Sequence, residues 1–136
     1  MPRPRATRLL YAAATLSLLA AILHAWVMPE HLFEWWGYGT VFLATAVFQA
    51  LYALALARHP RPWLYRLGIA VNLAIIALWV WTRTVGIPLL GPGAGETEPV
   101  GRLDVVSKVA EAGLVALLAA LLWRAGRARS GAGHHL

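Results

Sequence analysis

The sequence predicts an all-α protein, a four-helix transmembrane bundle with both termini in the cytoplasm. The composition supports this prediction, because 60% of the 136 residues are hydrophobic, 13% are charged and the mean hydropathy is +0.61. A soluble domain of this size needs more polar residues to cover its surface. Four long apolar runs occupy most of the chain, and each reaches the roughly 20 residues that a bilayer-spanning helix needs. A single transmembrane domain is therefore predicted over residues 1–129.

The first run is predicted to cross the membrane at residues 9–28. It has no formal charge and follows a basic segment, as the core of a secretory signal also does. The run is longer than a usual signal core, so we interpret it as a membrane span. Pro29 follows and favours a short new helix at the interface, where Glu30 and Glu34 suit a helix N-terminus.

The other three spans are predicted at residues 37–57, 66–86 and 102–123. The loop at 58–62 is short and contains two prolines, which predicts an antiparallel hairpin of the second and third spans. The loop at 86–101 is long for a membrane bundle and rich in glycine and proline, as functional or mobile loops often are. Whether this loop acts as a lid over a site at that end is left open by the sequence.

The distribution of charge predicts the orientation. Nine of the twelve basic residues fall on one side of the predicted topology, and the positive-inside bias makes that side cytoplasmic. We therefore expect a multi-pass protein of the bacterial cytoplasmic (inner) membrane. All six acidic residues fall in the outer half. Residues 130–136 are predicted to form a disordered tail. The nine basic residues on the inner side are Arg3, Arg5, Arg8, Arg58, Arg61, Arg66, Arg124, Arg127 and Arg129.

Charge and composition also restrict which partners are expected. The formal net charge is +6, but the arginines flank apolar runs instead of forming one basic surface, so nucleic-acid binding is not expected. The lipid bilayer is the expected environment, and four short helices expose enough surface to favour a homodimer. The chain has no cysteine, which excludes thiolate chemistry and cysteine-ligated metals.

Glu111 is the leading candidate for a functional residue. Counting back from Trp123 places it about 10 Å below the outer surface at a rise of about 1.5 Å per residue. A short carboxylate at that depth cannot reach the headgroups, and an unpaired charge there costs several kcal/mol. Glu111 is therefore expected to be protonated, paired or bound to a ligand.

Other ionisable residues are expected at the same depth on neighbouring helices. Asp104, Lys108 and Glu111 are spaced i, i+4, i+7 and share one stripe, while Arg83 and His24 come from the third and first spans. Arg83 and Lys108 are candidates for ion pairing or a relay. Imidazole and carboxylate ligands suit zinc, iron or manganese, and Met28, four residues after His24, keeps copper open. The candidate metal ligands are His24, His31, Glu34, Glu98, Asp104 and Glu111.

A purely structural role for the same residues remains open. Glu111 could pair with Arg83 or Lys108, and His24 could bond a backbone carbonyl, because intramembrane ion pairs also serve packing. Deeper in the membrane, Gln49 and Asn72 are expected to link helices through hydrogen bonds.

Several functions are compatible with these residues. The first is binding of a divalent transition metal at an outward-facing site of histidines and carboxylates. A membrane enzyme is the alternative, either a quinone or haem oxidoreductase or a metal-dependent hydrolase. A proton-coupled transporter and a non-catalytic assembly subunit are further alternatives. Whether the protein is an enzyme, and which substrate it takes, is left open by the sequence.

Two segments resemble a recurring class of small bacterial four-span membrane proteins. The resemblance implies the topology and a cluster of motifs at the outer face, and it implies no catalytic residues. The first segment is Pro29-Glu30-His31 with Glu34-Trp35-Trp36-Gly37-Tyr38-Gly39. The second is Thr82 to Pro88, followed by Gly91-Pro92, Glu98 to Gly101 and Asp104.

Overall fold

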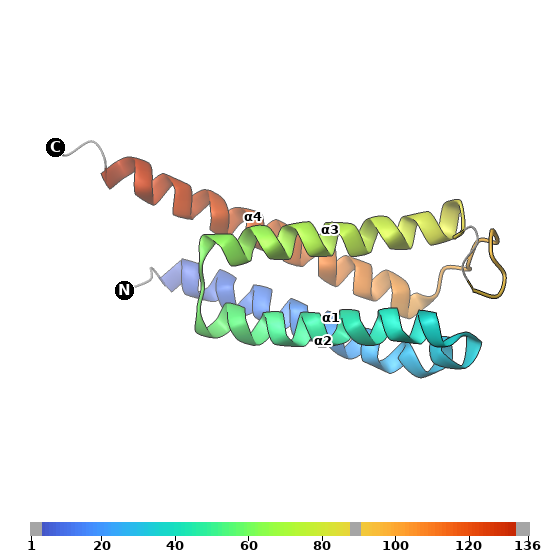
Figure 1. Ribbon diagram of the computed structural model, residues 1–136. Helices are drawn as coiled ribbons and strands as arrows, with labels where there is room; N and C mark the ends of the chain where they lie inside the picture. Colours follow the sequence, from blue (N-terminus) through green and yellow to red (C-terminus); the bar gives the residue numbers. More distant parts are fainter. Residues whose placement is uncertain (1–3, 88–90, 133–136) are drawn as a thin grey trace.

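The computed structural model describes residues 4–87 and 91–132, and this part of the chain is a bundle of four α-helices without strands (Figure 1). The helices are α1 (Pro4–Glu34), α2 (Trp36–Arg58), α3 (Pro62–Thr84) and α4 (Arg102–Ala132). All four are long and apolar enough to cross a membrane. The predicted all-α four-helix transmembrane bundle is thereby confirmed, while the side on which the termini lie stays a prediction.

Two helices are longer than the sequence predicts. α1 continues through Pro29 to Glu34, so no separate interfacial helix begins at Pro29. A proline inside a helix removes one backbone donor and crowds the carbonyl four residues earlier. The chain nevertheless continues as helix beyond Pro29. α4 extends beyond the predicted end at Trp123 to Ala132, which includes the first residues of the predicted tail. The rest of that tail, 133–136, lies outside the described residues.

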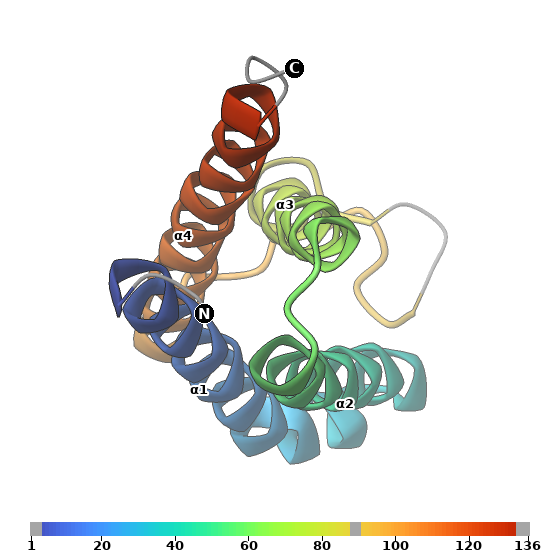
Figure 2. The same cartoon turned by 90° about the vertical axis from the view of Figure 1, so that its left-hand side faces the viewer.

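The helices run antiparallel in sequence order and define two ends. Both described chain ends and the turn at 59–61 lie at one end, which we name the terminal end (Figure 1). The long loop at 85–101 lies at the other, which we name the long-loop end. Seen along the bundle, α1 lies beside both α2 and α4, and α3 lies beside α4 (Figure 2).

α2 and α3 are joined by a short turn but do not pack along their lengths, unlike the predicted hairpin. Near the turn, Tyr52 bridges the two helices by donating its hydroxyl to the Leu64 carbonyl at 2.7 Å. The Tyr52 ring lies against Gly68, where a Cβ atom would collide with it. The ring thus separates the two backbones, and α3 packs mainly against α4.

The apolar core fills the half of the bundle nearest the terminal end. It joins small residues of α1 to larger side chains of the other helices. The helix exteriors carry many exposed Leu, Val and Trp side chains, which in a bilayer face the acyl chains. The buried core residues are Ala13, Ala14, Tyr52, Leu56, Leu64, Tyr65, Leu114, Leu118 and Leu121.

The end of α3 and the start of α4 are fixed by backbone bonds. Gly86 has φ 80° and donates its N–H to the Trp81 carbonyl at 3.0 Å, which closes the last turn of α3 in a conformation that glycine adopts at little cost. The Glu98 N–H returns to the Thr82 carbonyl at 3.0 Å. The loop therefore folds back over the bundle and brings Glu98 beside α3.

Candidate functional site

Buried polar side chains from all four helices meet in the middle of the bundle. Ser17 of α1 donates to the Gln49 carbonyl of α2 at 2.8 Å. The Gln49 amide donates to Asn72 of α3 at 3.4 Å and to Glu111 of α4 at 3.0 Å. Ser17, Gln49, Asn72 and Glu111 are all fully buried. The expectation that Gln49 and Asn72 link helices through hydrogen bonds is confirmed, and both side chains belong to one network with Glu111.

Glu111 lies at the centre of this network and is paired. Lys108, one turn earlier on α4, donates to Glu111 Oε2 at 2.6 Å, and Gln49 donates to Oε1. His24 Nε2 of α1 lies 3.6 Å from Oε1. Of the two pairings considered from sequence, the one with Lys108 is confirmed, while Arg83 bonds other carboxylates.

The ring of His24 is oriented by its own helix. Its Nδ1 lies 2.8 Å from the Ala20 carbonyl oxygen, which only accepts hydrogen bonds, so Nδ1 carries the proton. Nε2 of the neutral ring is then an acceptor that faces the acceptor Oε1 of Glu111. A proton placed on this nitrogen converts the contact into an ion pair.

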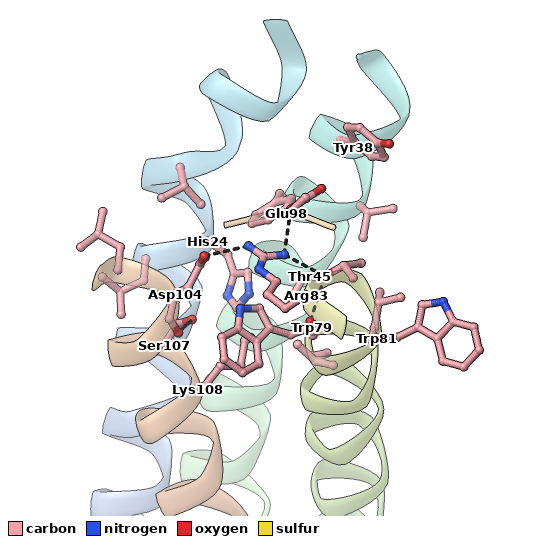
Figure 3. A pocket seen from close by; sticks show the side chains of 18 of the residues that line it. His24, Tyr38, Thr45, Trp79, Trp81, Arg83, Glu98, Asp104, Ser107 and Lys108 are labelled. Carbon is pink, nitrogen blue, oxygen red and sulfur yellow. Dashed lines mark hydrogen bonds and ion pairs between the residues drawn. The ribbon is translucent and has the colours of Figure 1, made fainter. Parts of the chain in front are cut away.

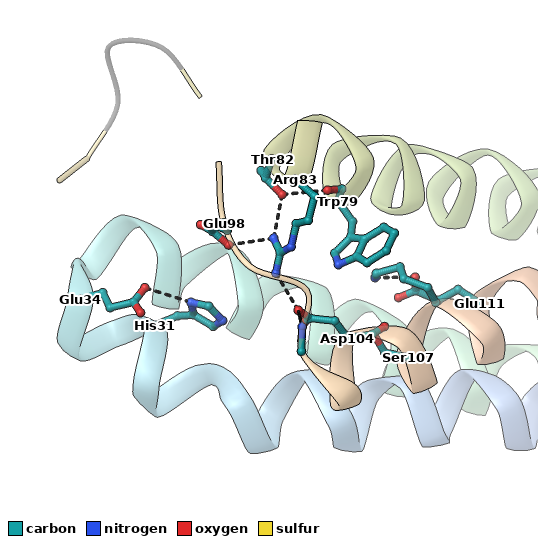
Figure 4. Close-up of polar contacts among 11 residues, drawn as sticks. His31, Glu34, Trp79, Thr82, Arg83, Glu98, Asp104, Ser107 and Glu111 are labelled. Carbon is teal, nitrogen blue, oxygen red and sulfur yellow. Dashed lines mark hydrogen bonds and ion pairs between the residues drawn. The ribbon is translucent and has the colours of Figure 1, made fainter. Parts of the chain in front are cut away.

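A second polar cluster lies at the long-loop end around Arg83. Its guanidinium donates to Glu98 and to Asp104, each at 2.7 Å (Figure 4). Asp104 Oδ2 also accepts the Gly101 N–H at 3.1 Å, which caps the first turn of α4. Arg83 therefore ties the end of α3 to the loop and to the start of α4.

His31 and Glu34 form a separate pair at the end of α1. His31 Nδ1 lies 3.2 Å from Glu34 Oε2. The His31 ring stacks on Phe42 of α2 with the ring centroids 4.0 Å apart, and Phe42 also contacts the His24 ring at 5.7 Å. Phe42 thus stands next to both histidines.

The six predicted metal ligands are therefore distributed over three contacts. His24 lies by Glu111, His31 by Glu34, and Arg83 holds Glu98 and Asp104 together. Within residues 4–87 and 91–132, no three or more histidine, aspartate or glutamate side chains are grouped to hold a metal ion. The arrangement brings the predicted residues to one half of the bundle without assembling them into one coordination site.

An apolar chamber of about 370 Å³ lies between these polar clusters and reaches the surface of the bundle (Figure 3). Its imidazole, cationic and carboxylate groups come from His24, Arg83, Glu98, Asp104 and Lys108, and it also has hydroxyl and indole groups. The rest of its lining is mostly apolar, and on the side between α2 and α3 its rim includes exposed side chains. The apolar lining includes Leu23, Val27, Val41, Phe42, Ile75 and Leu78.

The chamber follows from the wide separation of α2 and α3. Val41 on α2 and Leu78 and Trp81 on α3 line it and are 49%, 46% and 50% exposed. Exposed apolar residues of a transmembrane helix face lipid, so the chamber opens towards the membrane interior at this rim. A hydrophobic molecule could reach the polar clusters from the bilayer without passing through water.

Two donors in the chamber wall are buried but unused. Trp79 Nε1 and Arg83 Nε are shielded from solvent and have no hydrogen-bond partner within the described part of the chain. Both residues line the chamber, and the Arg83 guanidinium lies 5.8 Å from the centre of the Trp79 ring. Figure 4 shows the indole of Trp79 directed into the space between α3 and α4.

Sequence reasoning missed Gln49 as a partner of Glu111 and Trp79 as part of the site. Nothing in the sequence distinguishes Trp79 from Trp81, which lies two residues away and is 50% exposed. The i, i+3 spacing of Lys108 and Glu111 was visible and correctly indicated a pair.

Comparisons with known proteins add no further assignment. No protein-family model, no curated protein and no solved structure matches this chain. The resemblance of its loop motifs to small bacterial four-span proteins accordingly stays a prediction. The site is interpreted from its own geometry.

Proposed function

We propose that this membrane protein binds a small, largely apolar organic molecule that enters the chamber from the bilayer between α2 and α3. The chamber itself is the observation that carries the proposal. Its volume of about 370 Å³ lies in the range of small-molecule sites, which are typically apolar with a few polar groups. The polar groups lie on its wall and the exposed apolar rim faces lipid.

The buried network supports binding over a purely structural role. Packing explains the bonds among Gln49, Asn72 and Glu111, but it does not explain a volume left open beside Lys108 and Arg83. Interiors are normally filled to high density, and a buried donor without a partner is costly. An occupant would fill the chamber and could accept hydrogen bonds from the two buried donors without a partner, Trp79 Nε1 and Arg83 Nε.

Photolabelling in lipid nanodiscs tests this proposal. A photoreactive alkyl diazirine should label the peptide that contains Phe42 and Thr45, both of which line the chamber. Ile75→Trp places a larger side chain in the chamber and should reduce this labelling at least several-fold. Leu73→Trp adds the same side chain at an exposed position on α3 and should leave the labelling unchanged. Equal labelling in the two variants would exclude a ligand chamber here.

Binding of a divalent transition metal is the second candidate. The Nδ1 proton of His24 is held by a backbone carbonyl, which leaves Nε2 directed at Glu111 as in many metal-binding histidines. Lys108 competes for the same carboxylate at 2.6 Å. This candidate requires about one equivalent of zinc, iron or copper in the purified protein, lost in His24→Ala, and elemental analysis measures both.

A further inference from the structure

The unused donors indicate what the polar end of an occupant must be. Trp79 offers an indole N–H, and Arg83 offers its Nε–H while its terminal nitrogens are already bonded to Glu98 and Asp104. Tryptophan and arginine side chains have donors and no acceptors. The complementary ligand group is therefore a hydrogen-bond acceptor such as an oxygen atom.

The charges around the chamber indicate that this oxygen is uncharged. Arg83 and Lys108 contribute two positive charges, whereas the carboxylates bonded to them, Glu98, Asp104 and Glu111, contribute three negative charges when ionised. Both cations thus already have anionic partners. A ligand carboxylate would add a fourth negative charge in a medium that screens little, which is unfavourable.

We propose that the occupant is a neutral amphiphile whose polar end is a carbonyl group, as in a ketone, an ester or a quinone. Both donors are closed to water in this structure, so binding turns Trp79 Nε1 and Arg83 Nε towards the carbonyl oxygen, which accepts from them. Its apolar part lies against Phe42 and Ile75 and extends towards the rim between α2 and α3. This inference rests on the proposed function and specifies the class of ligand for the same chamber.

Competition against the alkyl diazirine in nanodiscs tests the ligand class. Four competitors of equal chain length are compared: an alkane, a methyl ketone, a carboxylate and a primary amine. In the unaltered protein the ketone should compete about ten-fold better than the alkane, as expected for a net gain of one to two hydrogen bonds. The carboxylate and the amine should compete less well than the ketone.

Trp79→Phe keeps an aromatic ring and removes the N–H. In this variant the advantage of the ketone over the alkane should fall several-fold, while competition by the alkane stays the same and shows that the chamber is intact. Trp81→Phe is the matched control, because Trp81 also lines the chamber but is half exposed. The ketone should keep its advantage there.

The outcomes separate the two proposals. If neither alkane nor ketone competes, the proposed function itself fails. If the alkane competes and the ketone is no better, or if Trp79→Phe leaves the ketone advantage unchanged, the chamber binds ligands but the carbonyl assignment is wrong. Stronger competition by the carboxylate would overturn the inference that the ligand is neutral.

Discussion

Glu111 shows how a carboxylate can be kept inside an apolar bundle. Removing such a group from water costs several kcal/mol unless donors replace the lost hydration. Here Lys108 and Gln49 donate to its two oxygens, and His24 lies near one of them. Lys108 lies on the same helix as Glu111, so this ion pair can form as soon as α4 forms. Gln49 and His24 lie on α2 and α1 and contact Glu111 only when these helices pack against α4.

Replacing Lys108 should leave the buried carboxylate of Glu111 without its cationic partner. We expect Lys108→Met to lower the free energy of unfolding by about 3–5 kcal/mol, the range found when one partner of a buried pair is removed. Adding Glu111→Gln to this variant should restore at least half of the loss, because the remaining amide is uncharged and can still accept from Gln49. Reversible denaturation in detergent micelles measures all three stabilities.

The exposed Glu96 provides the control for this experiment. Glu96→Gln should change the unfolding free energy by less than about 0.5 kcal/mol, as is usual at exposed positions. A double variant no more stable than Lys108→Met would show that the charge of Glu111 is compensated by something other than Lys108.

At the scale of the helices, the contact of Tyr52 with Gly68 sets the distance between α2 and α3. The tyrosine hydroxyl reaches over Gly68 to the Leu64 carbonyl, and Leu118 of α4 packs at the same point. The absence of a side chain at Gly68 is what lets the hydroxyl end of the ring approach α3.

Gly68→Ala should therefore destabilise the bundle. The new Cβ would lie 2.6 Å from Leu118 Cδ1 and would collide with the Tyr52 ring, so we expect a loss of about 1–3 kcal/mol, typical of overpacking. Thermal unfolding followed by circular dichroism measures it. Gly126→Ala on α4 has open space around the added methyl group and should instead stabilise by up to about 1 kcal/mol through helix propensity. Equal effects of the two alanines would contradict this account.

At the scale of the whole molecule, the two ends of the bundle differ in charge. The terminal end carries arginines, and the acidic residues gather at the long-loop end. By the positive-inside bias the terminal end is expected in the cytoplasm, which would place the chamber and the Arg83 cluster in the outer half of the membrane.

Single cysteines can test this orientation, because the chain has none of its own. A membrane-impermeant maleimide should label Thr97→Cys in intact bacterial cells and should label His59→Cys only after the membrane is permeabilised. Both positions are exposed, and they lie at opposite ends of the bundle. The cysteine-free parent chain gives the background. The reverse pattern would refute the predicted orientation, and labelling of both in intact cells would indicate a dual topology.

The sequence by itself determined the four helices, their approximate limits and the burial of Glu111. Length and apolar composition are sufficient to predict the spans. A segment that crosses a bilayer needs about 20 apolar residues whose backbone groups are all hydrogen-bonded within the segment, and a helix provides this. The Lys108–Glu111 pair was also predictable, since both residues lie on one helix and their spacing fixes their proximity.

Only the tertiary structure decided how the helices combine. The sequence does not encode in any local pattern that α2 and α3 would separate, that Gln49 would reach Glu111, or that Arg83 would bind Glu98 and Asp104 instead of Glu111. These contacts depend on the rotation and tilt of each helix, which many small packing interactions set together. The predicted metal ligands share one half of the bundle for reasons of sequence, but their division into three contacts, with an apolar chamber beside them, is a property of the packing.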